Sequence, residues 1–302
     1  MIQPLNIEKQ TNGYIGRFSV MASPCEILVD LPASNLAAQH SSEQIHTMMW
    51  HVYTEAKRIE QKFSRYVKGN IVDKLNNSGG DVIALDEETA RLLDFAYQCY
   101  ELSDGLFDIT SGVLRKVWSF DSSDKVPSLA CIQPILKDIG LNKLQWNSPN
   151  VVIPKNMQLD FGGIGKEYAV DRCLQVATGI LNIPTLINFG GDLACNGPRA
   201  NKEPWQVGIE SVGGGSPAAI RLPHGALATS GDARRYLMKD NVRYSHILNP
   251  VTGSSVLGAP RSITIAAPTC IEAGLMSTMA MLQGAEAADF LKEQEIPHWI
   301  QA

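Results

Sequence analysis

The chain has 302 residues, of which 44% are hydrophobic and 19% charged, so it is long enough to bury a substantial core. Its formal net charge of −5 provides no global basic field, which argues against nucleic acid or an anionic membrane surface as the main partner. The six cysteines are scattered and form no Cys-x-x-Cys pair, which argues against a disulfide framework and against a cysteine metal site.

The first residues of the chain carry neither a basic region nor an apolar core of the kind found in signal peptides. No run of about 18 apolar residues occurs anywhere in the sequence, so we expect no integral membrane segment. The sequence therefore predicts a cytoplasmic protein.

The first half of the chain combines a predicted hairpin with helices. Alternating apolar residues over 13–31 predict a β-hairpin. A long helix is expected after Ser42, its N-cap, because apolar residues from Ile45 to Phe63 recur at three- and four-residue spacing. A second helix is expected from about Asp86 to Ser103, ended by Gly105, and a third after Ser128.

From Leu144 onward, short β-like runs dominate, and they are interrupted by one helix after Gly165 and another after Thr269. The segment GGGSP at 213–217 has the composition of a loop tip. The whole pattern predicts an α+β protein of mixed α/β content with much antiparallel sheet.

One stretch, LDFGGIGKEYAVD at 159–171, has the composition of an anion site. We interpret LDF as the end of a strand and the residues after Gly165 as an amphipathic helix. Glycines at such a junction leave N–H groups free for a phosphate, and Lys166 adds a full charge. The stretch lacks both the Walker A spacing and the pattern G-x-G-x-x-G. Taken alone, it is better explained as a tight turn with a solvated lysine.

Seven segments in order decide the matter, because together they resemble the signatures of the FAD:protein FMN transferases, the ApbE-like flavin transferases once described as thiamine biosynthesis lipoproteins. The segments are VMASPCEI (20–27), FSRY (63–66), LSDGLFDITSGVL (102–114), LDFGGIGKEYAVD, INFGGD (187–192), ATSGD (228–232) and YSHILNP (244–250). The resemblance covers about 15–285. It implies one ApbE-like domain over 1–302, with largely antiparallel sheets, packed helices and two intimately associated lobes.

The resemblance implies an enzyme that uses FAD and Mg²⁺. Such an enzyme cleaves the FAD pyrophosphate and attaches FMN through a phosphoester to a Ser or Thr of a target flavoprotein. The resemblance assigns catalysis to His246 and Lys166, cofactor binding to Met21, Ser64, Tyr66, Asp108, Gly163, Lys166, Asp171, Gly191, Ser230, Gly231 and Asp232, and the metal to Gly165, Thr278 and the position of Gly274. The chemistry fits these residue types, since lysine and glycine backbone can stabilise phosphate charge and histidine can act as a base.

The sequence departs from the family pattern at the metal site. Where the family has A-D-A-L-A-T, this chain reads AGLMST at 273–278, so Thr278 is kept and Gly274 replaces the carboxylate. Losing that charge should lower magnesium affinity. Glu272 lies roughly opposite on the helix and is a poor substitute. Glu167, which replaces a glycine of the family beside Lys166, is the better candidate.

Three functions therefore remain open from the sequence. The first is an active flavin transferase with an altered metal site. The second is an FAD-binding protein without transferase activity, and the third is a magnesium-dependent FAD hydrolase that releases FMN and AMP. Because the histidine, the lysine and the threonine are all kept, we favour the transferase.

Overall fold

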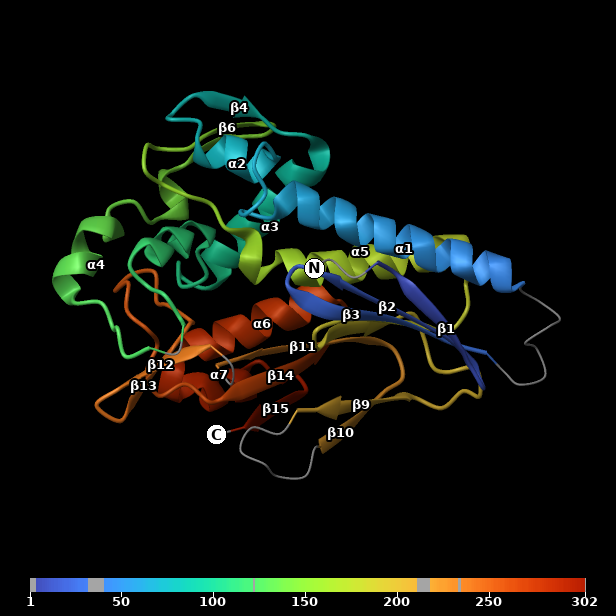
Figure 1. Cartoon of the computed structure of the whole chain (residues 1–302). Helices are drawn as coiled ribbons and strands as arrows, with labels where there is room; N and C mark the ends of the chain where they lie inside the picture. Colours follow the sequence, from blue (N-terminus) through green and yellow to red (C-terminus); the bar gives the residue numbers. More distant parts are fainter. Residues whose placement is uncertain (1–3, 32–40, 122, 211–217, 233–234, 302) are drawn as a thin grey trace.

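A computed structural model describes residues 4–31, 41–121, 123–210, 218–232 and 235–301 of the chain. The predicted loop tip at 213–217 lies outside these residues. Within them, the secondary structure consists of helices and antiparallel sheets, which confirms the α+β class (Figure 1).

The centre of the fold is an eight-stranded sheet with the order β1-β2-β3-β7-β8-β11-β14-β15. Its strands are β1 Asn6–Gln10, β2 Gly13–Val20, β3 Ser23–Asp30, β7 Thr185–Phe189, β8 Asp192–Cys195, β11 Gly225–Gly231, β14 Ser262–Ala267 and β15 His298–Gln301. Every neighbouring pair is antiparallel. The predicted hairpin is β2–β3, whose two turn residues Met21 and Ala22 both have positive φ, as a two-residue turn with the twist of the strands requires.

Three helices cover one face of this sheet and build the main core with it. They are α1 Ser42–Phe63, α5 Gly165–Ile180 and α6 Cys270–Leu282 (Figure 1). The predicted long helix is confirmed as α1, but its N-cap is Ser41 rather than Ser42. Ser41 Oγ accepts a hydrogen bond from Gln44 N, and the Gln44 side chain accepts one from Ser41 N, so the reciprocal capping box fixes the start one residue earlier.

A smaller antiparallel sheet covers the opposite face. It pairs β9 Trp205–Ile209 with β10 Ala218–Leu222. Side chains alternate along the central strands, so Leu186 and Leu193 pack toward this hairpin while Ile187 lies in the main core. Both faces of the sheet are therefore buried.

The residues between β3 and β7 add a largely helical part at one end of the molecule (Figure 1). It contains α2 Ile71–Asn76, β4 Val82–Ala84, α3 Glu87–Leu102, η1 Ile109–Lys116, α4 Leu129–Leu136, η2 Leu141–Lys143, β5 Gln145–Asn147, β6 Asn150–Val152 and η3 Phe161–Gly163. The helix expected from Asp86 is α3, which Asp86 caps through Thr89 N. The remaining elements are β12 Tyr236–Lys239, β13 Val242–Ser245, η4 Gly284–Glu286 and α7 Ala287–Glu293.

Candidate functional site

The glycine-rich stretch forms a short 3-10 turn, η3, that leads into α5. The expectation that LDF ends a strand is wrong. Leu159 N donates to Asn76 Oδ1 at 2.7 Å, Leu159 O accepts from Asn76 Nδ2 at 3.0 Å, and Asp160 N donates to Ile109 O at 2.8 Å. Because these backbone groups bond to a side chain and to η1, none is left for a β-ladder. The predicted helix after the glycines is confirmed as α5, and Gly165 is its first residue.

Lys166 forms a buried ion pair with Asp192, the first residue of β8. Lys166 Nζ lies 2.5 Å from Asp192 Oδ2, and the side-chain exposures are 28% and 3%. Asp192 Oδ1 accepts a hydrogen bond from Thr229 N at 3.0 Å, so β11 also holds it in place. Burial opposes the charged lysine, but Asp192 and Glu167 together raise the pKa of Lys166 above its ordinary value.

Asp192 is a site residue that the sequence analysis did not single out. It ends the quoted segment INFGGD, whose glycines Gly190 and Gly191 both have positive φ in the turn between β7 and β8. The sequence did contain a signal for Asp192, because an acidic residue that directly follows a glycine turn begins the next strand at a fixed position. The ion pair with Lys166 could not be predicted from the sequence, since no spacing rule relates the two segments.

Glu167 places its carboxylate beside α6 and is not fully paired. Its Oε2 atom is buried and has no hydrogen-bond partner within the described residues. Burial and the nearby charge of Asp192 raise the pKa of Glu167 above its ordinary value, although Lys166 opposes this shift. A Cβ atom built on Gly274 would lie only 2.5 Å from Glu167 Cγ. The Glu167 side chain therefore fills the space beside Gly274.

The face of α6 that carries Gly274 and Thr278 meets the end of β11. Ser230 Oγ lies 2.9 Å from Thr278 Oγ1 and 2.8 Å from Ser277 Oγ. The start of α6 is fixed by Asp171 of α5, whose carboxylate accepts hydrogen bonds from the N–H groups of Cys270 and Ile271 at 2.8 and 2.9 Å. Asp171 therefore positions the helix, and its predicted contact with the cofactor stays a prediction.

His246 follows β13 and lies apart from the lysine. Its Nδ1 is 3.3 Å from the Arg235 carbonyl oxygen, and its ring meets Phe120 edge-on. Since a carbonyl oxygen only accepts, this bond puts the proton on Nδ1 and leaves Nε2 free as a base. Burial and the charge of Arg235 lower the pKa of His246 to about 4. Within the described part of the chain, no hydrogen bond or ion pair joins His246 to Lys166.

Two predicted carboxylates are already bonded by their own chain. Asp108 caps η1 through Thr110 and also accepts from Leu141 N at 3.0 Å. Asp232 pairs with Arg243 at 2.6 Å and with Arg261 at 3.1 Å. These contacts fix the loops that carry the two residues, and any direct contact of either side chain with FAD stays a prediction.

The remaining predicted cofactor residues are spread over neighbouring loops. Met21 N donates to Glu60 Oε1, which ties the β2–β3 turn to α1. Ser64 ends α1, and Tyr66 is 76% exposed with its hydroxyl accepting from Arg115 at 2.6 Å. A side chain at Gly163 would require the ring of Phe107 to shift, because a Cβ there would lie 3.2 Å from that ring.

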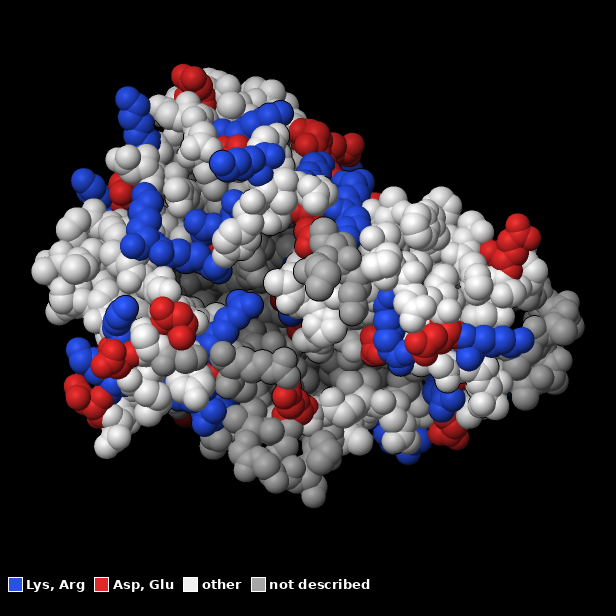
Figure 2. Space-filling model, viewed as in Figure 1, with Lys and Arg blue, Asp and Glu red and all other residues white. Residues whose placement is uncertain are grey.

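Basic side chains surround a hollow on one face of the molecule. Figure 2 shows Lys and Arg side chains at the edge of this hollow, which lies near the middle of that view. Among the basic side chains of the site loops, Arg65 and Arg115 both pair with Asp160, and the Arg235 carbonyl oxygen lies beside His246. The overall negative charge is thus compatible with a local anion site.

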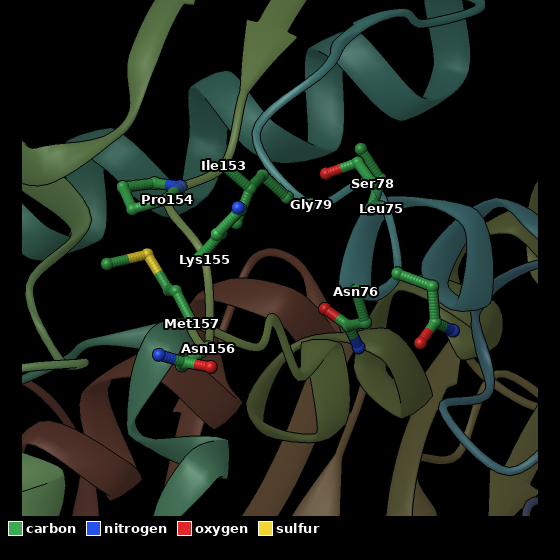
Figure 3. Close-up of a pocket in the computed structure, with 10 residues that line it drawn as sticks. Leu75, Asn76, Ser78, Gly79, Ile153, Pro154, Lys155, Asn156 and Met157 are labelled. Carbon is green, nitrogen blue, oxygen red and sulfur yellow. The ribbon is translucent and has the colours of Figure 1, made fainter.

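The described residues also form a cavity of about 230 Å³ away from this site, between the end of α2 and the loop after β6. Figure 3 shows Asn76, Ser78, Lys155 and Met157 on its walls. Among the described residues, no group of three or more His, Cys, Asp or Glu side chains has the arrangement of a metal site. A metal bound near Glu167 must therefore use other oxygen atoms as well.

Comparison with known proteins identifies the family. A model of the ApbE family matches residues 21–300. The chain belongs to the ApbE family. The crystal structure of the ApbE protein of Thermotoga maritima superposes with a TM-score of 0.84 at 31% identity and covers 95% of this chain and 94% of its own. The resemblance seen in the sequence is confirmed.

Other members of the ApbE family extend the comparison. The FAD:protein FMN transferase of Vibrio cholerae is 29% identical over 241 residues, which is 76% of this chain and 71% of that protein. The FAD:protein FMN transferase of Chlamydia pneumoniae is 29% identical over 236 residues, 75% of this chain and 74% of its own. The apo flavinyl transferase ApbE of Pseudomonas stutzeri shares the fold, with a TM-score of 0.82 at 21% identity over 99% of this chain and 92% of its own.

Proposed function

We propose that this ApbE-family chain is an FAD:protein FMN transferase and that 1–302 forms one domain of the family. The observation that carries the proposal is the start of α5, where Lys166 pairs with Asp192 and Glu167 lies against Gly274 of α6, in a chain whose relatives carry this name. FAD is the substrate, and the partner is a flavoprotein with an acceptor Ser or Thr.

The proposed reaction exchanges one P–O bond for another. The oxygen of the acceptor hydroxyl bonds to the phosphorus of the FMN half, the pyrophosphate bond breaks, and AMP leaves. Lys166, already held by Asp192, stabilises the charge that develops on the phosphate oxygens. N–H groups at the start of α5 add a second source of positive potential.

His246 is the proposed general base. Its free Nε2 accepts the proton of the acceptor hydroxyl, while the Arg235 carbonyl keeps the ring in the required tautomer. Because its pKa is lowered to about 4, the imidazole is neutral and ready to accept a proton near neutral pH.

Magnesium is the proposed metal. The Thr278 hydroxyl, which lies 2.9 Å from Ser230 Oγ, and the Gly165 carbonyl at the start of α5 are oxygen donors of the kind that a hard cation takes. When bound, such an ion neutralises phosphate charge during pyrophosphate cleavage.

One experiment separates the three candidate functions. The purified protein is incubated with FAD and Mg²⁺, with and without a flavoprotein acceptor, and AMP release and acid-stable flavin on the acceptor are followed. Transfer predicts both products only when the acceptor is present. AMP release without acceptor would establish the hydrolase instead, and FAD binding without AMP release would establish a binding protein.

We propose further that the protein acts in the cytoplasm. The thiol of Cys131 is free and exposed, which suits a reducing compartment better than an oxidising one. No helix among the described residues combines the length and the apolar composition needed to cross a bilayer. Fractionation of cells that express the native gene tests this, and recovery of the protein outside the cytoplasm would contradict it.

A further inference from the structure

We infer that Glu167 supplies the metal-binding carboxylate that family members carry at the position of Gly274, so that the acidic ligand has moved from α6 to α5. The inference rests on the proposed function, because it concerns the magnesium site of that function. It explains two departures from the family pattern, a glutamate where a glycine is usual and a glycine where an aspartate is usual, as one compensating exchange.

The first argument is steric. An ideal Cβ at Gly274 would lie 2.5 Å from Glu167 Cγ, 3.0 Å from Cδ and 3.1 Å from Oε1. A contact of 2.5 Å is far below any van der Waals separation, so Glu167 in its present position excludes a side chain at 274. The two positions therefore share one space, and the Glu167 carboxyl group occupies the space that a carboxylate at 274 would need.

The second argument is the unpaired oxygen. Glu167 Oε2 is buried without a hydrogen-bond partner in the described chain, which is costly for a carboxylate. Lys166 relieves this cost only in part, because its ammonium group makes its close contact, at 2.5 Å, with Asp192. Two carboxylates thus share one lysine in a buried place. A cation at this point would bind the Oε2 atom, which no other group in the described chain bonds.

The third argument is the position of Thr278. It lies one turn after Gly274 on the same face of α6, and one turn advances a helix by about 5.4 Å. A carboxyl group beside Gly274 is therefore within reach of an ion held by the Thr278 hydroxyl. The Gly274 carbonyl is engaged by Ser277 Oγ at 3.0 Å. Glu167 thus offers the nearby carboxylate oxygen that has no partner yet.

The test measures metal binding directly. Mn²⁺, which takes the same oxygen ligands as Mg²⁺, is titrated into the full chain with and without FAD, and free Mn²⁺ is followed by electron paramagnetic resonance. The variants are Glu167→Gln, Glu167→Gly, Gly274→Asp and the double variant Glu167→Gly/Gly274→Asp. Glu101→Gln, which removes an exposed charge from α3, is the matched control.

We expect Glu167→Gln to weaken Mn²⁺ binding by at least 10-fold, the scale on which even supporting residues of a metal site act, while the control binds as wild type. The double variant should regain much of the lost affinity, whereas Gly274→Asp alone should lower the melting temperature because of the steric overlap with Glu167. This pattern is non-additive, as expected for two residues that share one space.

Unchanged Mn²⁺ affinity in Glu167→Gln would overturn the inference, and so would a double variant that binds no better than Glu167→Gly. Either result would indicate that Glu167 is only a buried neutral side chain. FAD affinity of the wild type, measured by flavin fluorescence, separates this failure from failure of the proposed function. A wild type that binds FAD and transfers FMN while Glu167→Gln binds Mn²⁺ normally would refute the inference alone.

Discussion

At the scale of single residues, Lys166 has two roles, and a single substitution would remove both at once. It is the proposed partner of the FAD phosphates, and it also neutralises the buried Asp192 at 2.5 Å. Breaking a buried pair by removing one partner costs about 3 to 5 kcal/mol, because the other charge stays buried and unpaired. Loss of activity alone would therefore say little about phosphate binding.

We predict that Lys166→Met weakens FAD binding by about 1 to 3 kcal/mol, the scale of a charged hydrogen bond, and also lowers stability. The double variant Lys166→Met/Asp192→Asn should regain the stability without regaining the FAD affinity, since it removes both charges. Flavin fluorescence titration and urea unfolding measure the two quantities. An unchanged FAD dissociation constant would show that the lysine is only a solvated or structural charge.

For His246 we predict that substitution by alanine leaves FAD affinity nearly intact and lowers the transfer rate by about 10²- to 10⁴-fold, the range for general-base catalysis. FAD titration and single-turnover flavinylation check this. If binding and rate fall equally, the histidine is a cofactor contact instead.

The same residue sets a pH dependence. Burial, Arg235 and Arg115 favour the neutral imidazole, and Asp232 opposes them, so the pKa is lowered to about 4. A lowered pKa keeps the base form present as pH falls through the ordinary histidine range. We therefore expect transfer by the wild type, measured at a saturating Mg²⁺ concentration so that protonation of Glu167 does not limit it, to persist at pH 6 and to fall only near pH 4 to 5. A loss centred near pH 6.5 would contradict this.

At the scale of elements, the junction between β11 and β14 holds Ser230 and Asp232 in place. Gly231 lies between them, and a Cβ there would be 2.5 Å from the backbone oxygen of Arg261. We predict that Gly231→Ala destabilises the fold by about 1 to 3 kcal/mol, as overpacking does. Gly208→Ala in β9 is the control, because a Cβ there would meet nothing within 4 Å. Equal urea midpoints for the two variants would show that the junction accommodates an added methyl group without loss of stability.

The elements that the sequence predicts well are those with local signals. The helix from Glu87 begins at the capping residue Asp86, and the hairpin over 13–31 follows from alternation. The interpretation of LDF as strand failed because the backbone of Leu159 is bonded to Asn76, 83 residues earlier in the chain. Likewise, the motifs located Lys166 and Thr278, but no spacing rule could show that Glu167 touches Gly274.

At the scale of the whole molecule, the proposed site places the phosphates of FAD next to a metal position that has few protein ligands. We predict that FAD and Mg²⁺ bind with positive coupling, each tightening the other by the same factor, typically about 5- to 150-fold. Calorimetric titration of each ligand with and without the other measures both factors. Independent binding would indicate that the metal position does not face the FAD phosphates.

The order of the strands in the main sheet has a consequence for biosynthesis. Strand β11 pairs with β8 on one side and with β14 on the other, and α6, which carries Gly274 and Thr278, directly follows β14. A ribosome makes these last elements only after most of the chain has emerged, at about 5 to 20 residues per second. A nascent chain therefore cannot complete the proposed metal position until α6 has left the exit tunnel, and β11 presents an unpaired edge, which a chaperone could cover, until β14 has emerged.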